Sequence, residues 1–115
     1  MAADCLFCKI LRKEIPAEIV YENEAAVVIK DIQPCAPVHL LVIPKQHIES
    51  LNAIVPEQAA MLGQLQLAAQ AAAVVAGTAQ PGWRLISNVG PGGGQEVMHL
   101  HYHLIGGKIL GWTPD

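Results

Sequence analysis

Three histidines near the end of the sequence, His99, His101 and His103, alternate with apolar residues. Side chains two residues apart in an extended strand share a face, so the alternation predicts a strand with three imidazoles on one side. Such neighbours lie roughly 6–7 Å apart, too far for direct contact but close enough to surround one phosphate-sized group. Packing alone gives no reason to desolvate three imidazoles, so the pattern favours a chemical site over a structural one.

A glycine triplet, Gly92-Gly93-Gly94, comes shortly before the histidines. Glycine has no Cβ and tolerates positive φ, so backbone amides can approach a phosphate closely here. Alone, such a triplet is more often a flexible turn. Its position just before the histidines favours a phosphate-binding loop, in which the amides of Glu96 and Val97 would face the phosphate oxygens.

A second group that could do chemistry is the pair Cys5-x-x-Cys8. Two cysteines with this spacing at the start of a helix can supply half of a zinc site. The alternatives are two buried thiols or a redox pair, and the redox reading is the weaker of these because a βαβ context is missing. The third cysteine, Cys35, is assigned no role.

The elements that must position these residues follow from the apolar patterning. An antiparallel sheet of about five strands, one short N-terminal helix and one long helix make the chain α+β. We draw no domain boundary, so residues 1–115 are expected to form a single domain. The expected helices are residues 5–12 and 56–76, and the expected strands are 18–22, 25–30, 39–43, 83–88 and 97–105.

Charge and hydropathy exclude several classes of partner. A net charge of −3 gives no electrostatic argument for nucleic acid or an anionic membrane, so any phosphate binding must be local. The most apolar stretch, residues 67–76, is too short to cross a bilayer, and the first residues lack the features of a secretory signal. An odd number of cysteines does not suggest a disulfide framework, which favours a reducing cytoplasm.

Residues 99–105 fit the pattern His-φ-His-φ-His-φ-φ, where φ is apolar. This resembles the signature of the histidine triad (HIT) superfamily of nucleotide hydrolases and transferases. Outside the motif, the chain is similar to the Hint branch, the purine nucleoside phosphoramidases, in its bacterial form. The segments that carry this likeness are Asp31-Ile32-Gln33-Pro34, Ala36-Pro37-Val38-His39, Val42-Ile43-Pro44-Lys45 and Gly106-Gly107-Lys108.

The resemblance covers almost the whole chain and implies the HIT fold, a purine nucleotide substrate and a homodimer whose sheets join across the interface. It implies that His101 is the nucleophile, which forms a nucleotidyl-imidazole intermediate that water then hydrolyses. It further implies that His103 contacts the phosphoryl oxygens and that His39 orients or polarises the site. From the residues alone, a core histidine is the less favoured alternative for His39. His99 completes the catalytic triad.

The resemblance also implies a nucleotide pocket. Asp31 would bind the ribose hydroxyls, Asn88 the phosphate or leaving group, and Trp112 would reach the partner's site. Glu96 stands where animal Hint proteins have a serine that helps protonate the leaving group, which leaves its role open. The full set of expected nucleotide-binding residues is Leu6, Phe7, Ile10, Asp31, Ile32, Asn88, Gly94, Gln95, Glu96, Val97, His101 and His103.

Relatives that carry the cysteine pair often complete a structural zinc site with two histidines. At the matching positions this chain has His47 and His99, so Cys5, Cys8, His47 and His99 are the expected ligands. The chemistry itself would require no cofactor.

Three functions remain open on the sequence: a phosphoramidase, a dinucleoside polyphosphate hydrolase or nucleotidyl transferase of the same superfamily, and a non-catalytic nucleotide-binding dimer. His103 favours the first, because hydrolases of the Fhit branch generally have glutamine there.

Overall fold

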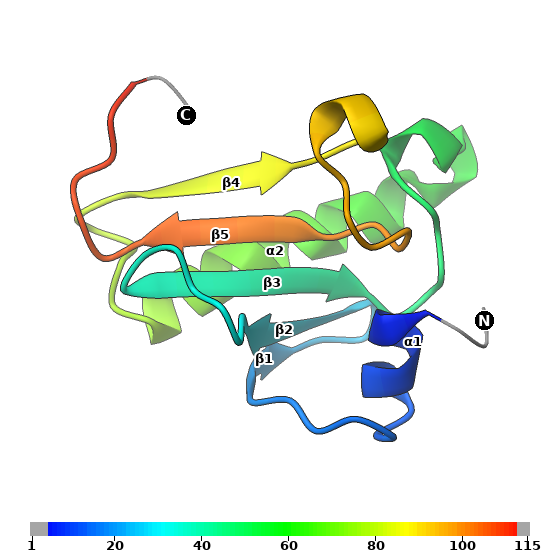
Figure 1. Cartoon of the computed structure of the whole chain (residues 1–115), viewed down its shortest axis with the longest axis horizontal. Coiled ribbons are helices and arrows are strands. Elements are labelled where there is room, and N and C mark those ends of the chain that lie inside the picture. The colour runs from blue at the N-terminus through cyan, green and yellow to red at the C-terminus, as the bar shows by residue number, and fades with distance from the viewer. Residues whose placement is uncertain (1–4, 113–115) are drawn as a thin grey trace.

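A five-stranded antiparallel sheet with the strand order β1-β2-β3-β5-β4 forms the centre of the molecule (Figure 1). The structure is a computed structural model and describes residues 5–112. Short 3₁₀ turns lie at Leu51–Ala53, Pro56–Gln58 and Pro91–Gly93. The main elements are α1 (Leu6–Leu11), β1 (Ile19–Glu22), β2 (Ala26–Lys30), β3 (Val38–Pro44), α2 (Ala59–Val75), β4 (Trp83–Ser87) and β5 (Tyr102–Gly106).

The alternation of side chains along the strands divides the sheet into two faces with different partners. The first face packs against α2, which runs behind the sheet in Figure 1. This core contains Val28, Leu40, Val42, Tyr102 and Leu104 from the strands and Leu65, Ala68, Ala69, Ala72 and Ala73 from α2. The opposite face packs against α1 through a smaller core that includes Phe7, Cys8, Ile29, Leu41 and Ile43.

The register of the central strands puts histidines on the α1 face. His39 alternates with Leu40 in β3, and His103 alternates with Leu104 in β5, so both imidazoles lie on the face opposite α2. In the antiparallel pairing, Leu41 of β3 stands opposite His103 of β5. The sheet therefore gathers polar side chains on one face and leaves the other to the apolar core.

The long helix begins later than expected. Pro56–Gln58 forms a 3₁₀ turn, in which the Gln58 side chain accepts a hydrogen bond from the Val55 amide at 2.9 Å, and α2 follows from Ala59. The helix ends at Val75 with Ala76 as its C-cap, and Gly77 follows with a φ of +76°, which favours glycine. The alanines on the buried side allow α2 to pack closely on the sheet.

The predicted strand over residues 97–105 is wrong in its first half. β5 begins only at Tyr102, because the segment before it bonds to a different partner: the Leu100 amide donates to the Ile48 carbonyl at 2.6 Å, and Ile48 lies outside the sheet. Met98, which the alternation with the histidines would place on the apolar face of that strand, is 41% exposed. The α+β class with five strands is confirmed. None of the helices described between residues 5 and 112 has the length and hydropathy to cross a membrane.

Candidate functional site

A cavity of about 540 Å³ opens on the α1 face of the sheet. It receives side chains from α1, β3, β5 and the loop before β5. The expected nucleotide-binding and catalytic residues that line it are Leu6, Phe7, Ile10, Asp31, Ile32, His39, Asn88, Gly94, Glu96, Val97, His101 and His103. Two expected residues, Gln95 and His99, do not line it; the structure places their side chains beside the cavity, in contacts described below.

The orientation of the His101 ring is fixed by the backbone. Its Nδ1 lies 2.7 Å from the carbonyl oxygen of His99, and because a carbonyl only accepts, Nδ1 carries the hydrogen. The neutral ring therefore has its lone pair on Nε2. Phe7 of α1 packs against the ring with centroids 4.9 Å apart in an edge-to-face arrangement. Burial is the largest influence on the pKa of His101 and lowers it, which favours the neutral form.

A chain of hydrogen bonds sets the tautomers of the two neighbouring histidines. The Cys35 backbone amide donates to Nδ1 of His39 at 3.1 Å, so His39 carries a hydrogen on Nε2. That nitrogen lies 2.9 Å from Nδ1 of His103 and 3.3 Å from a carboxylate oxygen of Asp31. His39 therefore donates to His103, which leaves His103 with its own hydrogen on Nε2. The two rings come from adjacent strands, β3 and β5.

Burial lowers the pKa of His103, and the nearby rings of His101 and His39 lower it further, while Asp31 and Glu96 act in the opposite direction. An unfolded chain binds this proton with a pKa near the ordinary 6.5. The folded chain binds it less readily, so the stability that depends on a neutral His103 is complete above that pH and decreases as the pH falls below it.

We therefore expect wild type to lose more stability than His103→Gln as the pH is lowered from about 7.5 to about 5.5. Glutamine can still accept the hydrogen bond from His39 but does not titrate. Urea denaturation at a series of pH values measures the two free energies of unfolding. Two curves that stay parallel over this range would contradict the expected titration.

The loop that precedes β5 holds a compact turn at residues 90–95. The Gly93 and Gln95 amides both donate to the Gly90 carbonyl, at 3.1 and 3.0 Å. The Asn88 side-chain amide donates to the Gly93 carbonyl at 2.8 Å, so this predicted ligand also supports the loop. Within residues 5–112 the backbone amides of Glu96 and Val97 donate no hydrogen bond to a backbone carbonyl, and both residues line the cavity. These two amides can therefore serve an anion.

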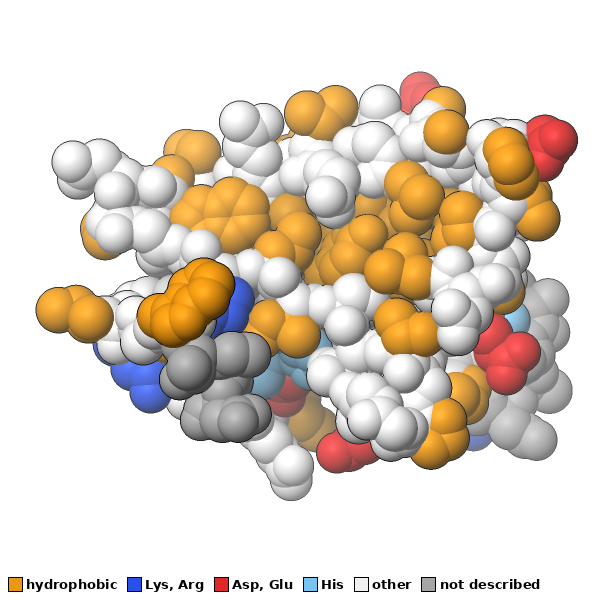
Figure 2. Space-filling model, turned by 90° about the horizontal axis from the view of Figure 1, so that it is seen from above, with side chains coloured by type: hydrophobic (Ala, Val, Ile, Leu, Met, Phe, Trp, Pro, Cys, Tyr) orange, Lys and Arg blue, Asp and Glu red, His pale blue; other side chains and the backbone are white. Residues whose placement is uncertain are grey.

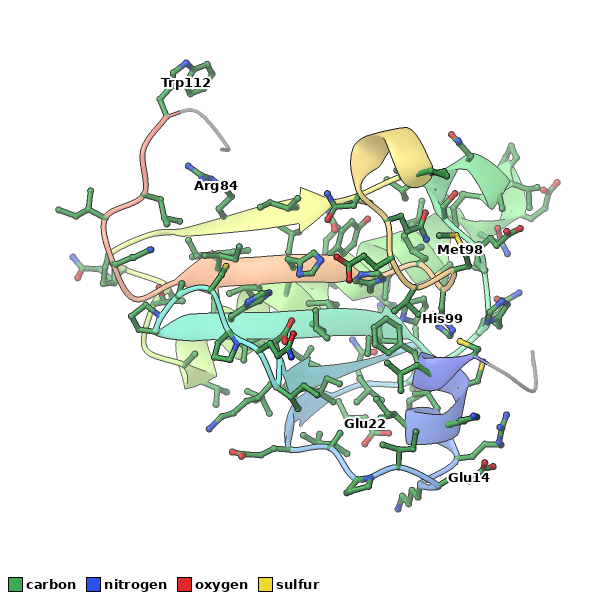
Figure 3. All side chains as sticks on the ribbon, viewed as in Figure 1. Glu14, Glu22, Arg84, Met98, His99 and Trp112 are labelled. Atoms are coloured by element: carbon green, nitrogen blue, oxygen red, sulfur yellow. The ribbon has the colours of Figure 1, made fainter. Side chains whose placement is uncertain are left out.

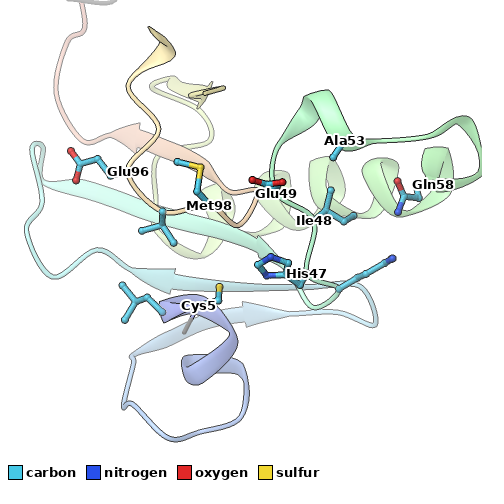
Figure 4. A pocket seen from close by; sticks show the side chains of 11 residues that line it. Cys5, His47, Ile48, Glu49, Ala53, Gln58, Glu96 and Met98 are labelled. Carbon is cyan, nitrogen blue, oxygen red and sulfur yellow. The ribbon is translucent and has the colours of Figure 1, made fainter. Parts of the chain in front are cut away.

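A second cluster lies next to the cavity, where α1 begins. Ligand atoms of Cys5, Cys8, His47 and His99 all lie within 4.8 Å of one another. Nδ1 of His99 is 3.2 Å from the Cys5 sulfur, 3.6 Å from the Cys8 sulfur and 3.1 Å from Nδ1 of His47. Figure 3 shows His99 close to the first turn of α1, and Figure 4 shows the sulfur of Cys5 turned toward the His47 ring. The four residues form a candidate metal site.

The donor atoms fit a tetrahedral ion. With bonds of about 2.3 Å to sulfur and about 2.0 Å to nitrogen, neighbouring ligands of a tetrahedral zinc stand roughly 3.3–3.8 Å apart. The Cys8 sulfur lies 3.3 Å from Nδ1 of His47, and the other contacts are similar. Nε2 of His99 donates to the Pro44 carbonyl at 2.9 Å, so its Nδ1 presents a lone pair to the cluster. Two sulfurs and two ring nitrogens that converge at this distance suit a cation.

The group Asp31, His39 and His103 also brings its ligand atoms within 4.8 Å of one another. Its chemistry does not fit a metal. The Nε2 atom with which His39 faces the other two residues carries a hydrogen, because its Nδ1 accepts from Cys35. It has no lone pair to give to an ion, so this group acts through hydrogen bonds.

A larger hollow of about 750 Å³ adjoins the histidine cavity (Figure 4). The two share Leu6, Glu96 and Val97 in their linings. Glu96 therefore stands between the space beside the histidines and an open region that reaches the metal cluster and the Pro56–Gln58 turn. Nothing in the sequence pattern pointed to this second hollow, because its lining comes from segments far apart in the chain.

The chain is similar to proteins of one family over its whole length. The family model described as the C-terminal binding region of the scavenger mRNA decapping enzyme matches residues 4–111. An uncharacterised HIT-like protein of Synechococcus elongatus is 49% identical over 99% of both chains. The purine nucleoside phosphoramidase of Escherichia coli is 43% identical over 96% of this chain and 93% of its own.

Among solved structures, a HIT family hydrolase from Clostridium thermocellum superposes with a TM-score of 0.97, at 45% identity over the full length of both chains. The histidines of residues 99–105, the fold and the relatives lead to the same conclusion. The chain belongs to the HIT family of histidine triad proteins.

Proposed function

We propose that this protein hydrolyses the P–N bond of purine nucleoside 5′-phosphoramidates, with His101 as the nucleophile. The observation that carries the proposal is the hydrogen bond from Nδ1 of His101 to the His99 carbonyl. It commits the lone pair of the neutral ring to Nε2, and His101 lines the cavity. The similarity to the purine nucleoside phosphoramidase of Escherichia coli supports this substrate class.

The reaction proceeds in two steps. Nε2 of His101 attacks phosphorus, a P–N bond forms to the imidazole, and the bond to the substrate amine breaks as that amine takes up a proton. Water then attacks the nucleotidyl-imidazole, which releases the nucleoside monophosphate and regenerates the neutral ring. One water is consumed for each phosphoramidate, and the products are the monophosphate and a free amine.

The surrounding groups suit the charge that develops on the phosphoryl oxygens. His103 keeps its Nε2 hydrogen because its Nδ1 accepts from His39, so it can donate to an oxygen. The amides of Glu96 and Val97 supply two further donors from the backbone. The Glu96 side chain is exposed beside the cavity, where a carboxyl can deliver the proton that the leaving amine requires.

The rest of the cavity suits a nucleoside. Leu6, Phe7, Ile10 and Ile32 form its apolar part, which we assign to the purine. Ile32 is 93% exposed, so a bound base would cover it. One carboxylate oxygen of Asp31 accepts from the Gln33 amide at 2.8 Å, which holds the side chain at the cavity, where we assign it to the ribose hydroxyls.

We assign the cluster of Cys5, Cys8, His47 and His99 to a structural zinc ion. Such an ion supplies no chemistry to the reaction; when bound, it ties α1 to the segment that carries His101. The chain's own residues do the rest: Pro44 orients His99, and the His99 carbonyl orients His101. Reduced thiolates are required, and we therefore place the protein in the cytoplasm.

We also propose that the protein is a homodimer joined along β4. This strand ends the sheet, and Figure 2, which looks onto the side of the molecule that carries β4, shows hydrophobic side chains gathered in the middle of that face. Leu67 and Val74 of α2 are 54% and 64% exposed. Trp112 is 95% exposed on the C-terminal tail (Figure 3), which suits the expectation that it reaches the partner's site.

Hydrolysis of adenosine 5′-phosphoramidate by the purified protein tests the substrate class. We expect release of AMP at a rate far above that from a dinucleoside polyphosphate, because His103 stands where hydrolases of the Fhit branch generally have glutamine. Faster cleavage of the polyphosphate would select the alternative hydrolase function. AMP binding without turnover of either compound would select the non-catalytic nucleotide-binding dimer.

A further inference from the structure

Gln95 is a buried polar residue whose side chain is fully engaged within the protein. It is 7% exposed and does not line the histidine cavity. Its Oε1 accepts from the Gly90 amide at 2.8 Å, and its Nε2 donates to the carbonyls of Glu49 and Val97 at 2.7 and 3.0 Å. Both hydrogens of the amide are therefore used, and the side chain has no donor left for a nucleotide.

These bonds close the glycine loop on itself. Gly90 is bonded on both sides by the same residue, since its amide donates to the Gln95 side chain and its carbonyl accepts from the Gln95 amide. The loop from Gly90 to Gln95 contains two glycines with positive φ, Gly90 at +70° and Gly94 at +83°. Glycine adopts many other conformations as well, so hydrogen bonds are required to hold the loop in this one. The bond to the Val97 carbonyl extends the same support to a residue that lines the cavity.

The third bond connects this loop to a distant segment. Glu49 lies two residues after His47, a candidate metal ligand, and its carbonyl accepts from Gln95. The neighbouring Ile48 carbonyl accepts from Leu100, between His99 and His101. The Gln95 side chain thus links the segment that carries His47 to the glycine loop. The bond from Leu100 to Ile48 links the same segment to the histidines.

We propose that Gln95 is a positioning residue: its amide holds the loop of residues 90–97 in the shape that receives the phosphate and anchors that loop to the segment of His47. The inference rests on the proposed function only in naming the phosphate as the loop's ligand. It changes the expected role of Gln95 from direct nucleotide contact to support of the groups that make the contact.

The test compares Gln95→Met, which has a similar volume and no such hydrogen bonds, with Gln95→Glu, which keeps the acceptor for Gly90 but cannot donate when ionised. The measurements are amide hydrogen exchange of residues 90–97, AMP affinity, and kcat and KM for adenosine 5′-phosphoramidate. We expect faster exchange at Gly90 and Gln95, AMP affinity weakened about tenfold, and kcat/KM reduced about a hundredfold in Gln95→Met. Gln95→Glu should be impaired at least as strongly, because its ionised carboxylate would face the carbonyls of Glu49 and Val97, which also only accept.

Gln58→Met is the matched control, because it removes a side-chain acceptor from a backbone amide, that of Val55, outside the loop. It should leave AMP affinity unchanged. A Gln95→Met protein that loses thermal stability but keeps wild-type AMP affinity, kcat and KM would overturn the inference. If Gln95→Met fails to fold, the same readings are taken on Gln95→Asn, whose shorter amide cannot span the same hydrogen bonds.

Failure of the proposed function can be told apart from failure of this inference. Absence of turnover in wild type would reject the function, while the exchange rates of residues 90–97 and AMP affinity would still decide the role of Gln95. Wild-type turnover combined with identical loop exchange and AMP affinity in both Gln95 variants would reject the inference alone.

Discussion

Replacement of His101 with alanine is expected to reduce hydrolysis of adenosine 5′-phosphoramidate by about 10⁴-fold or more, because removal of a nucleophile eliminates the covalent route. Steady-state assays of AMP release measure the loss. The fold should survive, since the ring packs on Phe7 but makes its fixed hydrogen bond only to a local carbonyl. AMP affinity should remain within about tenfold of wild type, because His103, the loop amides and the apolar slot remain.

Two controls make the result specific to His101. Tyr102→Phe alters the adjacent residue, which belongs to the core on the α2 face, and should retain turnover. Acid-sensitive labelling of the protein by the nucleotide, a sign of a P–N adduct, should be seen with wild type and lost in His101→Ala. If the variant still turns over at a tenth of the wild-type rate or more, His101 is not the nucleophile.

The sequence pattern predicts correctly which face of the sheet carries the apolar residues next to the histidines. It predicts the bounds of β5 less well. Alternation around Leu100, Tyr102 and Leu104 fixes which side chains pack against α2, and those three do belong to that core. It does not reveal that His99 and His101 precede the regular strand. The late start of β5 depends on the bond from Leu100 to Ile48, a contact between segments about fifty residues apart that no local periodicity encodes.

The candidate site shows the same limit. Residue types and family likeness identify the histidines, the cysteine pair and the loop, because their chemistry is visible in the letters. The groups that set the tautomers are backbone atoms: the Cys35 amide on His39, the Pro44 carbonyl on His99 and the His99 carbonyl on His101. Backbone donors and acceptors are the same for nearly every residue type, so their roles become visible only when the fold brings them to the rings.

Gln95 illustrates how a correct location can hide a different role. Its place between the glycine triplet and the histidines suggested contact with the nucleotide, and only the paths of its three hydrogen bonds show that the side chain serves the protein. Glu96, the next residue, faces the cavity instead. Of these two neighbouring polar residues, one supports the loop and the other lines the cavity, a division set by the turn at residues 90–95.

Removal of the metal is expected to destabilise the folded chain strongly. We expect the purified protein to carry about one zinc per chain, and chelation to lower the free energy of unfolding by about 4 kcal/mol where free zinc had stood at about a thousand times its dissociation constant. For a chain of this size, that corresponds to a fall in Tm of about 15 °C. The physical reason is the close approach of the ligand atoms. Nδ1 of His99 carries no hydrogen and lies 3.1 Å from Nδ1 of His47, so without the ion the two ring nitrogens lose the cation that holds them together.

Cys8→Ser separates loss of the metal from loss of packing. Cys8 is fully buried, so the substitution alone has some cost, but a chelator should then lower the Tm of wild type and leave that of Cys8→Ser unchanged. Cys35→Ser is the matched control: it makes the same chemical change at an exposed cysteine and should keep both zinc content and the chelator response. Wild type and Cys8→Ser with equal zinc content, or a wild type indifferent to the chelator, would show that these four residues hold no structural metal. The His99 carbonyl would then orient His101 without help from an ion. Hydrogen bonds among the two thiols and the two imidazoles would have to hold the four residues together instead.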